Sequence, residues 1–349
     1  MVRVALVAGA TGLAGRRLCE HLAASPGWRV TGLARRPPAR APVPMLGADL
    51  ADTADCRNRL SALEGVTHLF YAVRHDHPEG EPEPEAVNTA MLRNLLEVVD
   101  ARSPALAHVN LVHGTKQYGH HLGPVPVPVA EDDARGPGPN FYFGQEDFVR
   151  SRAAGARWTW TIARPHTFCD PEGGHPRSIA LAIAVLAAIQ RELGEPLLFP
   201  GSAKAFQART QFTELALLAR ALEWMATEPR CANQAFNVVN GDSPRWSELW
   251  PALARELGLR AGTPSGVRLA EYMADKAPVW NAVVERHGLR RTALDRIVLW
   301  DYAGYVFRPE WDIISAMDKA RRLGFEERVD SREMFARLFS AYRAQRIIP

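Results

Sequence analysis

The first residues of the chain carry three glycines at a spacing suited to binding a phosphate group. An apolar run, residues 4–8, leads directly into Gly9-Ala-Thr-Gly12-Leu-Ala-Gly15, and apolar periodicity resumes after it. A buried strand, a glycine-rich turn and a helix in this order form a dinucleotide-binding unit, in which the helix N-terminus binds a pyrophosphate. Gly9 allows the tight turn, Gly12 lets the backbone approach the pyrophosphate, and Gly15 lets the helix pack on the strand. The expected pyrophosphate-binding residues are Gly9, Thr11, Gly12, Leu13, Ala14 and Gly15.

Two arginines follow the next apolar stretch of the chain. Residues 28–34 (WRVTGLA) read as a strand, and Arg35 and Arg36 come directly after it. A dinucleotide fold that prefers NAD carries an acidic residue here for the ribose hydroxyls. Two guanidinium groups instead suit a ribose 2′-phosphate, because each can donate two parallel hydrogen bonds to it. The pattern therefore favours NADPH as the cofactor, although such a basic pair is also common on solvated surfaces.

Further apolar stretches predict the elements that position these residues. Strands are expected at residues 42–50, 67–73, 107–112 and 158–163, an amphipathic helix at residues 86–101 and a further helix at residues 211–226. Strands that alternate with helices predict a parallel sheet, and ligands bind at the carboxyl ends of its strands. We therefore expect an α/β fold, a Rossmann-type doubly wound parallel sheet with a smaller, mainly helical C-terminal substrate lobe. The Rossmann domain is expected over residues 1–170, with returning strands around 199–242, and the lobe over 171–198 and 243–349.

A phenol and an amine follow the strand expected at residues 107–112. Lys116 comes just after that strand, and Tyr142 opens a later helix. With the GxxGxxG spacing of the glycines, this chain resembles the short-chain dehydrogenase/reductase class, whose members carry Tyr-x-x-x-Lys at this helix start. In that class the phenol donates a proton and the ammonium group lowers the phenol pKa. Here Glu146 stands four residues after Tyr142, so Lys116 is the only nearby candidate for the amine.

Longer motifs narrow this resemblance. HGTKQYG (113–119) and PNFYFGQEDFV (139–149) are similar to the TG-x-K-H-Y-x-G and NFYY-x-x-ED motifs of the progesterone 5β-reductase/iridoid synthase-like (PRISE-type) reductases, an atypical branch of the extended short-chain class. Further segments resemble other motifs of these reductases in the same order, so the resemblance covers essentially the whole chain. These segments are LARRP (33–37), ARP (163–165), FPGS (199–202) and FN…NGD…W (236–246).

The resemblance implies 1,4-reduction of enones and enals with NADPH. It implies that Tyr142 stabilises the enolate and that Lys116 holds the cofactor ribose and makes the phenol a better donor. Core packing of Tyr142 and a surface position for Lys116 are the alternatives, which the match at both motif positions disfavours. Cofactor contacts are also expected near the ends of the other strands. The residues expected there are Asp49, Leu50, Tyr71, Ala72, Pro165 and Thr167.

Some residues depart from the family pattern where its members border the nicotinamide and the substrate. His113 replaces the motif threonine, Gly119 closes the first motif, and His166 follows the ARP segment. Either histidine can add polar recognition or a proton route, or can be a hydrogen-bonded structural residue. Aromatic residues of the C-terminal lobe can line the pocket or belong to the core. The expected substrate-binding residues are His113, Gly119, His166, Trp300 and Tyr305.

Composition excludes several other classes of protein. The 349 residues carry 42 Lys and Arg against 39 Asp and Glu, a balance that favours neither a nucleic-acid nor a membrane partner. Four scattered cysteines indicate neither a disulfide framework nor a metal site, and we expect no metal. The N-terminal strand begins at residue 2 and the longest apolar run, residues 179–189, is too short to span a bilayer. A cytoplasmic protein is therefore expected, and a homodimer stays open.

We expect an NADPH-dependent oxidoreductase that reduces activated C=C bonds of a small, apolar enone or enal. A 1,2-carbonyl reductase with the same cofactor and tyrosine is the first alternative. A non-catalytic NADP(H)-sensing regulator of the same fold is the second. Such regulators commonly lack the tyrosine and lysine, and both candidates are present here.

Overall fold

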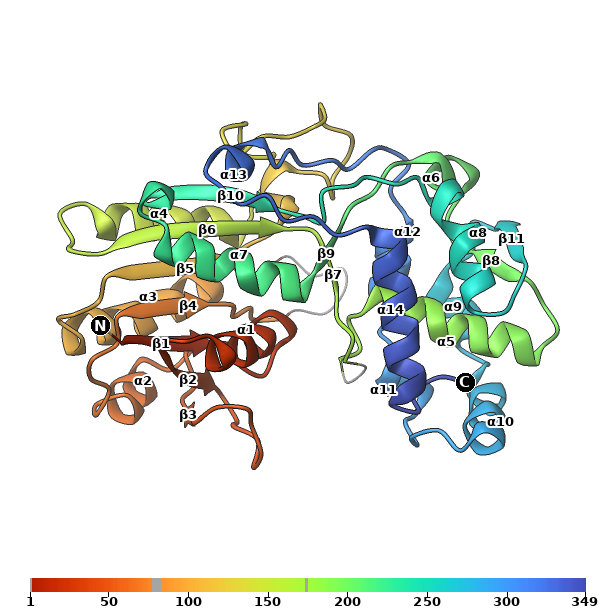
Figure 1. Cartoon of the computed structure of the whole chain (residues 1–349), viewed down its shortest axis with the longest axis horizontal. Coiled ribbons are helices and arrows are strands. Elements are labelled where there is room, and N and C mark those ends of the chain that lie inside the picture. Colours follow the sequence, from red (N-terminus) through yellow and green to blue (C-terminus); the bar gives the residue numbers. More distant parts are fainter. Residues whose placement is uncertain (1, 77–82, 173–174) are drawn as a thin grey trace.

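The computed structural model describes residues 2–76, 83–172 and 175–349 and is built around one parallel sheet (Figure 1). Its seven strands lie in the order β10-β6-β5-β4-β1-β2-β3, and all neighbours are parallel. Strand order reverses between β1 and β4, which is the arrangement of a Rossmann fold. The predicted fold class is thereby confirmed. The strands are β1 (Arg3–Ala8), β2 (Trp28–Ala34), β3 (Met45–Gly47), β4 (His68–Tyr71), β5 (His108–Val112), β6 (Thr159–Pro165) and β10 (Gln234–Val238).

Helices cover both faces of this sheet. One face packs against α1 and α7, and the other against α2, α3 and α4, each layer burying its own apolar cluster. The apolar runs of the strands are buried on both sides, as parallel sheets require. The helices are α1 (Leu13–Ala24), α2 (Thr53–Arg59), α3 (Glu85–Arg102), α4 (Phe141–Ala153) and α7 (Leu215–Thr227).

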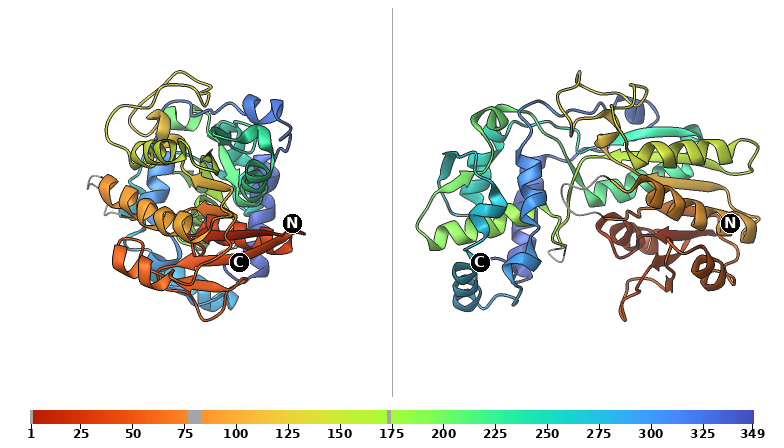
Figure 2. Two further views of the ribbon diagram at one scale, coloured as in Figure 1. Left: turned by 90° about the vertical axis from the view of Figure 1, so that its left-hand side faces the viewer. Right: turned by 180° about the vertical axis from the view of Figure 1, so that it is seen from behind.

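A second, mainly helical lobe lies beyond the carboxyl ends of the strands, on the right in Figure 1 and on the left in the view from behind (Figure 2). Its helices enclose the short pair β8–β11. These elements are α5 (Ile179–Glu192), β8 (Leu197–Phe199), α6 (Ala203–Gln207), α8 (Trp246–Glu256), β11 (Ala261–Pro264), α9 (Leu269–Met273), α10 (Ala277–His287), α11 (Leu294–Ile297), α12 (Trp300–Phe307) and α14 (Ser331–Ala344). In the described ranges, no helix is both long enough and apolar enough to cross a bilayer.

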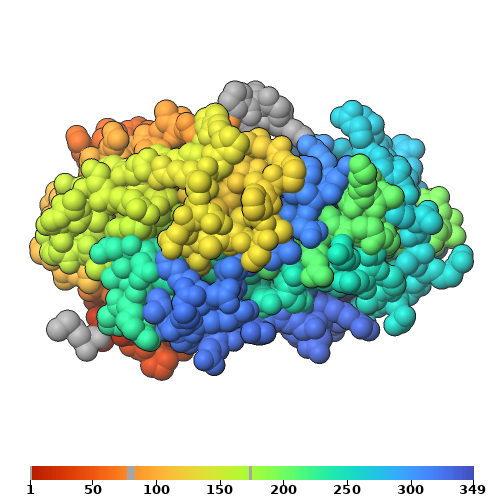
Figure 3. Space-filling view, turned by 90° about the horizontal axis from the view of Figure 1, so that it is seen from above, coloured from red at the N-terminus to blue at the C-terminus, as the bar shows by residue number. Residues whose placement is uncertain are grey.

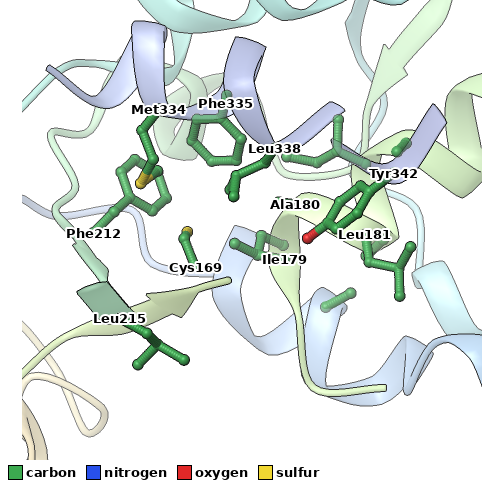
Figure 4. Packing of buried hydrophobic residues seen from close by; sticks show 14 of the residues in the cluster. Cys169, Ile179, Ala180, Leu181, Phe212, Leu215, Met334, Phe335, Leu338 and Tyr342 are labelled. Carbon is green, nitrogen blue, oxygen red and sulfur yellow. The ribbon is translucent and has the colours of Figure 1, made fainter. Parts of the chain in front are cut away.

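The C-terminal helix α14 ties the two lobes together. Met334, Phe335 and Leu338 face Phe212 and the start of α5 (Figure 4). At the same junction the Tyr342 hydroxyl donates to the carbonyl oxygen of Asp170 at 2.7 Å. A single buried cluster therefore runs from the α1 face of the sheet into the helical lobe. The walls of any cleft between the lobes are consequently held by one continuous core.

Two segments between the lobes differ from the expected secondary structure. The expected helix at residues 211–226 begins with a short strand, β9 (Phe212–Glu214), which pairs with β7 (Thr167–Cys169), and α7 starts only at Leu215. Of the strands expected to return around residues 199–242, β10 joins the main sheet, but β8 pairs with β11 in the helical lobe. Packing under α8 holds β8 there, where Trp250 Nε1 donates to the carbonyl oxygen of Leu197 at 3.0 Å.

Candidate active site

The glycine-rich turn between β1 and α1 is shaped for an anion. Gly9 adopts a φ of +82°, and a Cβ on it would overlap the carbonyl oxygen of Ala72 on the neighbouring strand end. A Cβ on Gly15 would overlap the carbonyl oxygen of Gly9, so only glycine allows the helix this close to the turn. No side chain caps the first turn of α1, which begins at Leu13. The N–H groups of that turn are therefore available to a pyrophosphate.

A cavity of about 420 Å³ extends from this turn along the ends of β2 and β4. Exposed Arg35 stands at its wall directly after β2, at the place expected for a ribose 2′-phosphate. Neighbouring Arg36 is exposed but does not border this cavity. The expected cofactor residues on this wall are Gly9, Thr11, Gly12, Arg35, Asp49, Leu50 and Ala72.

A second cavity, of about 290 Å³, lies between the ends of the sheet strands and α12. It shares Ala72, Val73 and Arg74 with the first cavity, so the two form one cleft along the carboxyl ends of the strands. Both expected catalytic side chains, Tyr142 and Lys116, border it. The other expected residues on its wall are Leu13, Ala14, His113, Pro165, His166, Thr167 and Tyr305.

Tyr142 is the second residue of α4, and its ring is fixed by packing. Asn140 caps the helix by accepting a hydrogen bond from the Tyr142 N–H at 3.1 Å. The phenol ring stacks on His113 with 4.5 Å between ring centroids and packs edge-on against Phe141. Burial raises the pKa of Tyr142 well above its ordinary value, against the opposing charge of Arg74. The phenol therefore stays protonated at neutral pH and can donate a hydrogen bond.

Lys116 reaches the same cavity from the opposite direction. It lies in the 3₁₀ helix η1 (Thr115–Tyr118), directly after β5. Its ammonium group donates to Glu83 Oε1 at 2.5 Å and lies 5.9 Å from the centre of the Tyr305 ring. The Asn140 side-chain nitrogen donates to the Lys116 carbonyl oxygen at 3.1 Å. Asn140 thus positions the segments of both candidate catalytic residues at once.

Glu146 explains why the usual helical lysine is absent. This carboxylate lies one turn after Tyr142 and is almost fully buried. It accepts hydrogen bonds from Arg164 on β6 and from Gln117, each at 3.3 Å, and pairs with Arg150 at 2.7 Å. A buried guanidinium requires such a partner. Glu146 therefore holds α4 against the sheet. The ammonium group that borders the cavity comes instead from Lys116 on η1.

The two histidines on the cavity wall differ in their surroundings. His113 is buried beneath the Tyr142 ring, and desolvation together with the charge of Arg164 lowers the pKa of His113 to about 3. His166 pairs through Nδ1 with the Thr115 hydroxyl at 2.7 Å. Desolvation lowers its pKa to about 3 as well. Both rings are therefore neutral at physiological pH.

The side chains on the wall give the second cavity a positive character. Arg74, Lys116 and Arg177 border it, and the carboxylates that pair with them, Glu83 and Asp76, lie just behind the wall, so three cations face two carboxylates among the described residues. This charge suits a cleft that receives an anionic dinucleotide. Sequence reasoning missed several of these residues, although Arg74 follows the end of β4 and its place was a usable signal. The missed residues on the wall are Arg74, Phe141, His175, Arg177 and Tyr302.

Five expected site residues border neither cavity in the described structure. Trp300 lies on the opposite face of α12 from Tyr305 and lines a separate cavity of about 610 Å³, because residues five apart face different ways on a helix. Gly119, expected at the substrate, ends η1 with a φ of +85° and packs against Pro137. Tyr71 is buried in the core on the α3 face. Gly15 and Arg36 are the remaining two.

Comparisons with known proteins agree with this arrangement. A model of the PRISE-like Rossmann-fold domain family matches residues 45–349. The chain is 35% identical over 366 residues to "3-oxo-Delta(4,5)-steroid 5-beta-reductase" of Arabidopsis thaliana, covering 99% of this chain and 93% of the relative. It is 32% identical over 368 residues to "(S)-8-oxocitronellyl enol synthase CYC2" of Camptotheca acuminata, with the same shares covered.

Solved structures support the fold alone. The structure of RMD from Pseudomonas aeruginosa complexed with NADPH has a TM-score of 0.67 to this chain at 13% sequence identity. The match covers 97% of this chain and 99% of that protein. A short-chain dehydrogenase/reductase superfamily protein from Agrobacterium tumefaciens with bound NAD matches with a TM-score of 0.68 at 16% identity, covering 98% of each chain. Both of those proteins hold a nicotinamide dinucleotide, and what this chain shares with them is the fold.

Proposed function

Because the chain belongs to the PRISE-like Rossmann-fold family, we propose that it is an NADPH-dependent ene-reductase that reduces the C=C bond of enones or enals. One observation carries the proposal: Tyr142 and Lys116 border a single cavity that opens into the dinucleotide cleft. The names of both relatives are consistent with this proposal. One relative is a 3-oxo-Δ(4,5)-steroid reductase, and the other is an enol synthase.

The residues of the cleft fit a dinucleotide phosphate. The turn at Gly9 to Gly15 would hold the pyrophosphate, and Arg35 would pair with the ribose 2′-phosphate at the end of β2. Lys116 and Thr167 would face the nicotinamide half from the second cavity. When bound, the reduced nicotinamide supplies a hydride to the β-carbon of the substrate. Arg35 favours NADPH over NADH, since the 2′-phosphate distinguishes the two.

Tyr142 would hold the carbonyl oxygen of the substrate. Negative charge grows on that oxygen as the double bond is reduced, and a phenol donor aimed at it stabilises the enolate more than the substrate. No described residue accepts a hydrogen bond from the phenol, so the donor is free for this role. The stacked His113 ring and the Asn140 cap hold it in place. Preorganisation of this kind removes the cost of orienting the donor during the reaction.

Lys116 would act on both cofactor and phenol. Its ammonium group is a donor for ribose hydroxyls, and its charge in the same cavity would favour negative charge on the phenol oxygen of Tyr142. In the described structure it pairs with Glu83, so ribose binding replaces that carboxylate. The rest of the wall is largely apolar or aromatic, including Leu13, Phe141 and Val306. Such a wall suits a small apolar enone or enal.

Product analysis tests this proposal. Purified protein is incubated with NADPH and either 2-cyclohexenone or trans-2-hexenal, and products are identified by gas chromatography. Oxidation of NADPH with a saturated ketone or aldehyde as product supports ene-reduction. An allylic alcohol would instead indicate 1,2-carbonyl reduction, and tight NADPH binding without turnover of any activated alkene would indicate a regulator.

A further inference from the structure

A small side cavity of about 30 Å³ adjoins the proposed catalytic cavity. Three histidines line it, namely His120, His121 and His166. The residues that line both this space and the catalytic cavity form the partition between them, and these are Thr115, Lys116, His166, Thr167, Tyr305 and Val306. A volume of this size holds one or two water molecules. We call this space the histidine cavity.

Several buried polar atoms around the histidine cavity need a hydrogen-bond partner, which ordered water can supply. His120 is only 2% exposed, and neither of its ring nitrogens has a hydrogen-bond partner among the described residues. The same holds for Nδ1 of His121. Buried polar atoms without a partner are costly, and ordered water is the usual remedy. No three His, Cys, Asp or Glu side chains within the described ranges are arranged to bind a metal ion, so water is the better occupant.

The histidines are placed and protonated as a relay requires. The Thr213 hydroxyl accepts a hydrogen bond from the backbone N–H of His166 at 3.0 Å, and the Thr115 hydroxyl pairs with ring Nδ1 of His166 at 2.7 Å. Trp311 fixes the other end, since its indole donates to the His120 carbonyl oxygen at 3.0 Å. Burial lowers the pKa of His120 to about 4 and that of His166 to about 3. Each neutral ring therefore carries one N–H and one lone pair.

One side of the histidine cavity lies close to the protein surface. His121 is half-buried, whereas Leu122 beside it is 59% exposed. The segment after η1 (yellow) and the segment after α12 (blue) adjoin on the face shown in Figure 3, and both contribute residues to the cavity wall. Their backbones are bonded where the N–H of Val129 donates to the carbonyl oxygen of Ile314 at 2.8 Å. These two segments therefore cover the histidine cavity, and His121 lies next to the protein surface.

We propose that the histidine cavity is a proton path that delivers solvent protons through Thr115 and His166 to the α-carbon of the reduced substrate. The inference rests on the proposed ene-reduction, which needs one proton for each hydride. After hydride reaches the β-carbon, the former π pair of the C=C bond becomes the enolate pair. That pair forms a bond to the proton on His166 Nε2, while Nδ1 takes the hydroxyl proton of Thr115. Thr115 regains a proton from cavity water that His120 would hold, and the water regains one from solvent. The ring then exchanges its proton with water to return from the Nδ1–H to the Nε2–H tautomer before the next turnover.

The configuration of the α-carbon tests the path. The substrate is 2-methyl-2-cyclohexenone, whose reduction creates a stereocentre at the protonated carbon. A proton delivered from one side of the cavity gives one enantiomer in excess, whereas an enolate or enol protonated in bulk water gives both. The readout is the enantiomer ratio of 2-methylcyclohexanone by chiral gas chromatography after a short incubation. This ratio reports the proton step and does not depend on the overall rate.

Three variants interrupt the path at different points: His120→Leu, Thr115→Val and His166→Phe. We expect each to lower the enantiomer ratio at least about tenfold, toward equal amounts, because Thr115→Val and His166→Phe remove a group that carries the proton and His120→Leu removes a polar partner of the cavity water. His68→Leu is the matched control, since His68 is also buried but lies at the start of the central strand β4, at the amino ends of the strands and away from the cavities at their carboxyl ends. It should leave the ratio unchanged.

The outcomes separate this inference from the proposed function. If the wild-type protein oxidises NADPH and yields saturated ketone in equal enantiomer amounts, the path is refuted and ene-reduction stands. An unchanged ratio in His120→Leu and Thr115→Val refutes it as well. If no saturated ketone forms from any enone, the proposed function fails and the path with it. A crystal structure of the wild-type protein adds a second readout, because a histidine cavity without ordered water would also overturn the path.

Discussion

Replacing Tyr142 with Phe removes the proposed donor and little else. Phe keeps the stacked contact with His113 and the edge contact with Phe141. The phenol oxygen bonds to no described residue, so no partner is left unpaired. The loss in catalysis is one hydrogen bond to a growing negative charge in a site that excludes water. Such a bond is worth about 2.7–4 kcal/mol, and we expect kcat to fall about 10²- to 10³-fold.

Stopped-flow measurement of NADPH absorbance gives the rate of reduction, and fluorescence titration gives the affinity for NADPH. We expect the affinity for NADPH to change less than about threefold, because the lost hydrogen bond is made to the substrate and not to the cofactor. Thermal unfolding should keep its midpoint within about 2 °C, since no buried bond is lost.

Tyr118→Phe is the matched control for this experiment. The Tyr118 hydroxyl donates to Asn237 at 2.6 Å and accepts from Arg164 at 3.1 Å, and it does not border the catalytic cavity. We expect this variant to lose about 1–3 kcal/mol of stability and to keep its rate. If Tyr142→Phe reduces enones at the wild-type rate, the phenol has no part in the chemistry and the reasoning fails.

Three other perturbations have expected outcomes. Replacing Arg35 and Arg36 together with Ala should weaken NADPH at least about tenfold more than NADH in titrations, because charge-assisted bonds to the 2′-phosphate are lost; equal losses, or the same effect in Arg40→Ala, would refute this assignment. Asn140→Asp keeps the helix cap but loses the donor to the Lys116 carbonyl oxygen, so kcat should fall. Its Tm should stay above that of Asn140→Ala, which also loses the cap, and equal Tm values in the two variants would show that Asn140 does not cap the helix. Burial lowers the pKa of His108 to about 3, so this ring stabilises the fold above pH 6.5 and loses that contribution as pH falls toward 3, by up to about 1.4 kcal/mol per pH unit. Tm measured between pH 7 and 4 should therefore drop less steeply in His108→Gln than in the wild-type protein.

The sheet was predictable because each of its longer strands is an apolar run in the sequence, followed by glycine or polar residues. The turn at Gly9 is an example, since its positive φ and its contact with Ala72 leave no alternative to glycine. The short strands were harder. The strand β9 has only three residues and pairs with β7, so its conformation is set by a distant segment rather than by its own pattern.

The candidate site was predictable where a motif fixed it and less so elsewhere. Lys116 and Tyr142 came from two motifs and border one cavity. Trp300 does not border that cavity. An aromatic residue in a helical lobe can face either side, and the rotation of α12 is set by its packing on α9 and α5. Arg177 lies shortly before α5 in the helical lobe, so its place on the cavity wall depends on how that lobe packs on the sheet. The histidine cavity likewise arises only when the segments after η1 and α12 meet.

Isotope labelling tests the central claim most directly. Saturated product is prepared from 2-cyclohexenone with NADPH that carries deuterium at the transferable C4 position, and the label is located by NMR. Ene-reduction in the cavity of Tyr142 and Lys116 predicts deuterium at the β-carbon of cyclohexanone, in one orientation, and no alcohol. Deuterium at the carbonyl carbon of an allylic alcohol would contradict the account.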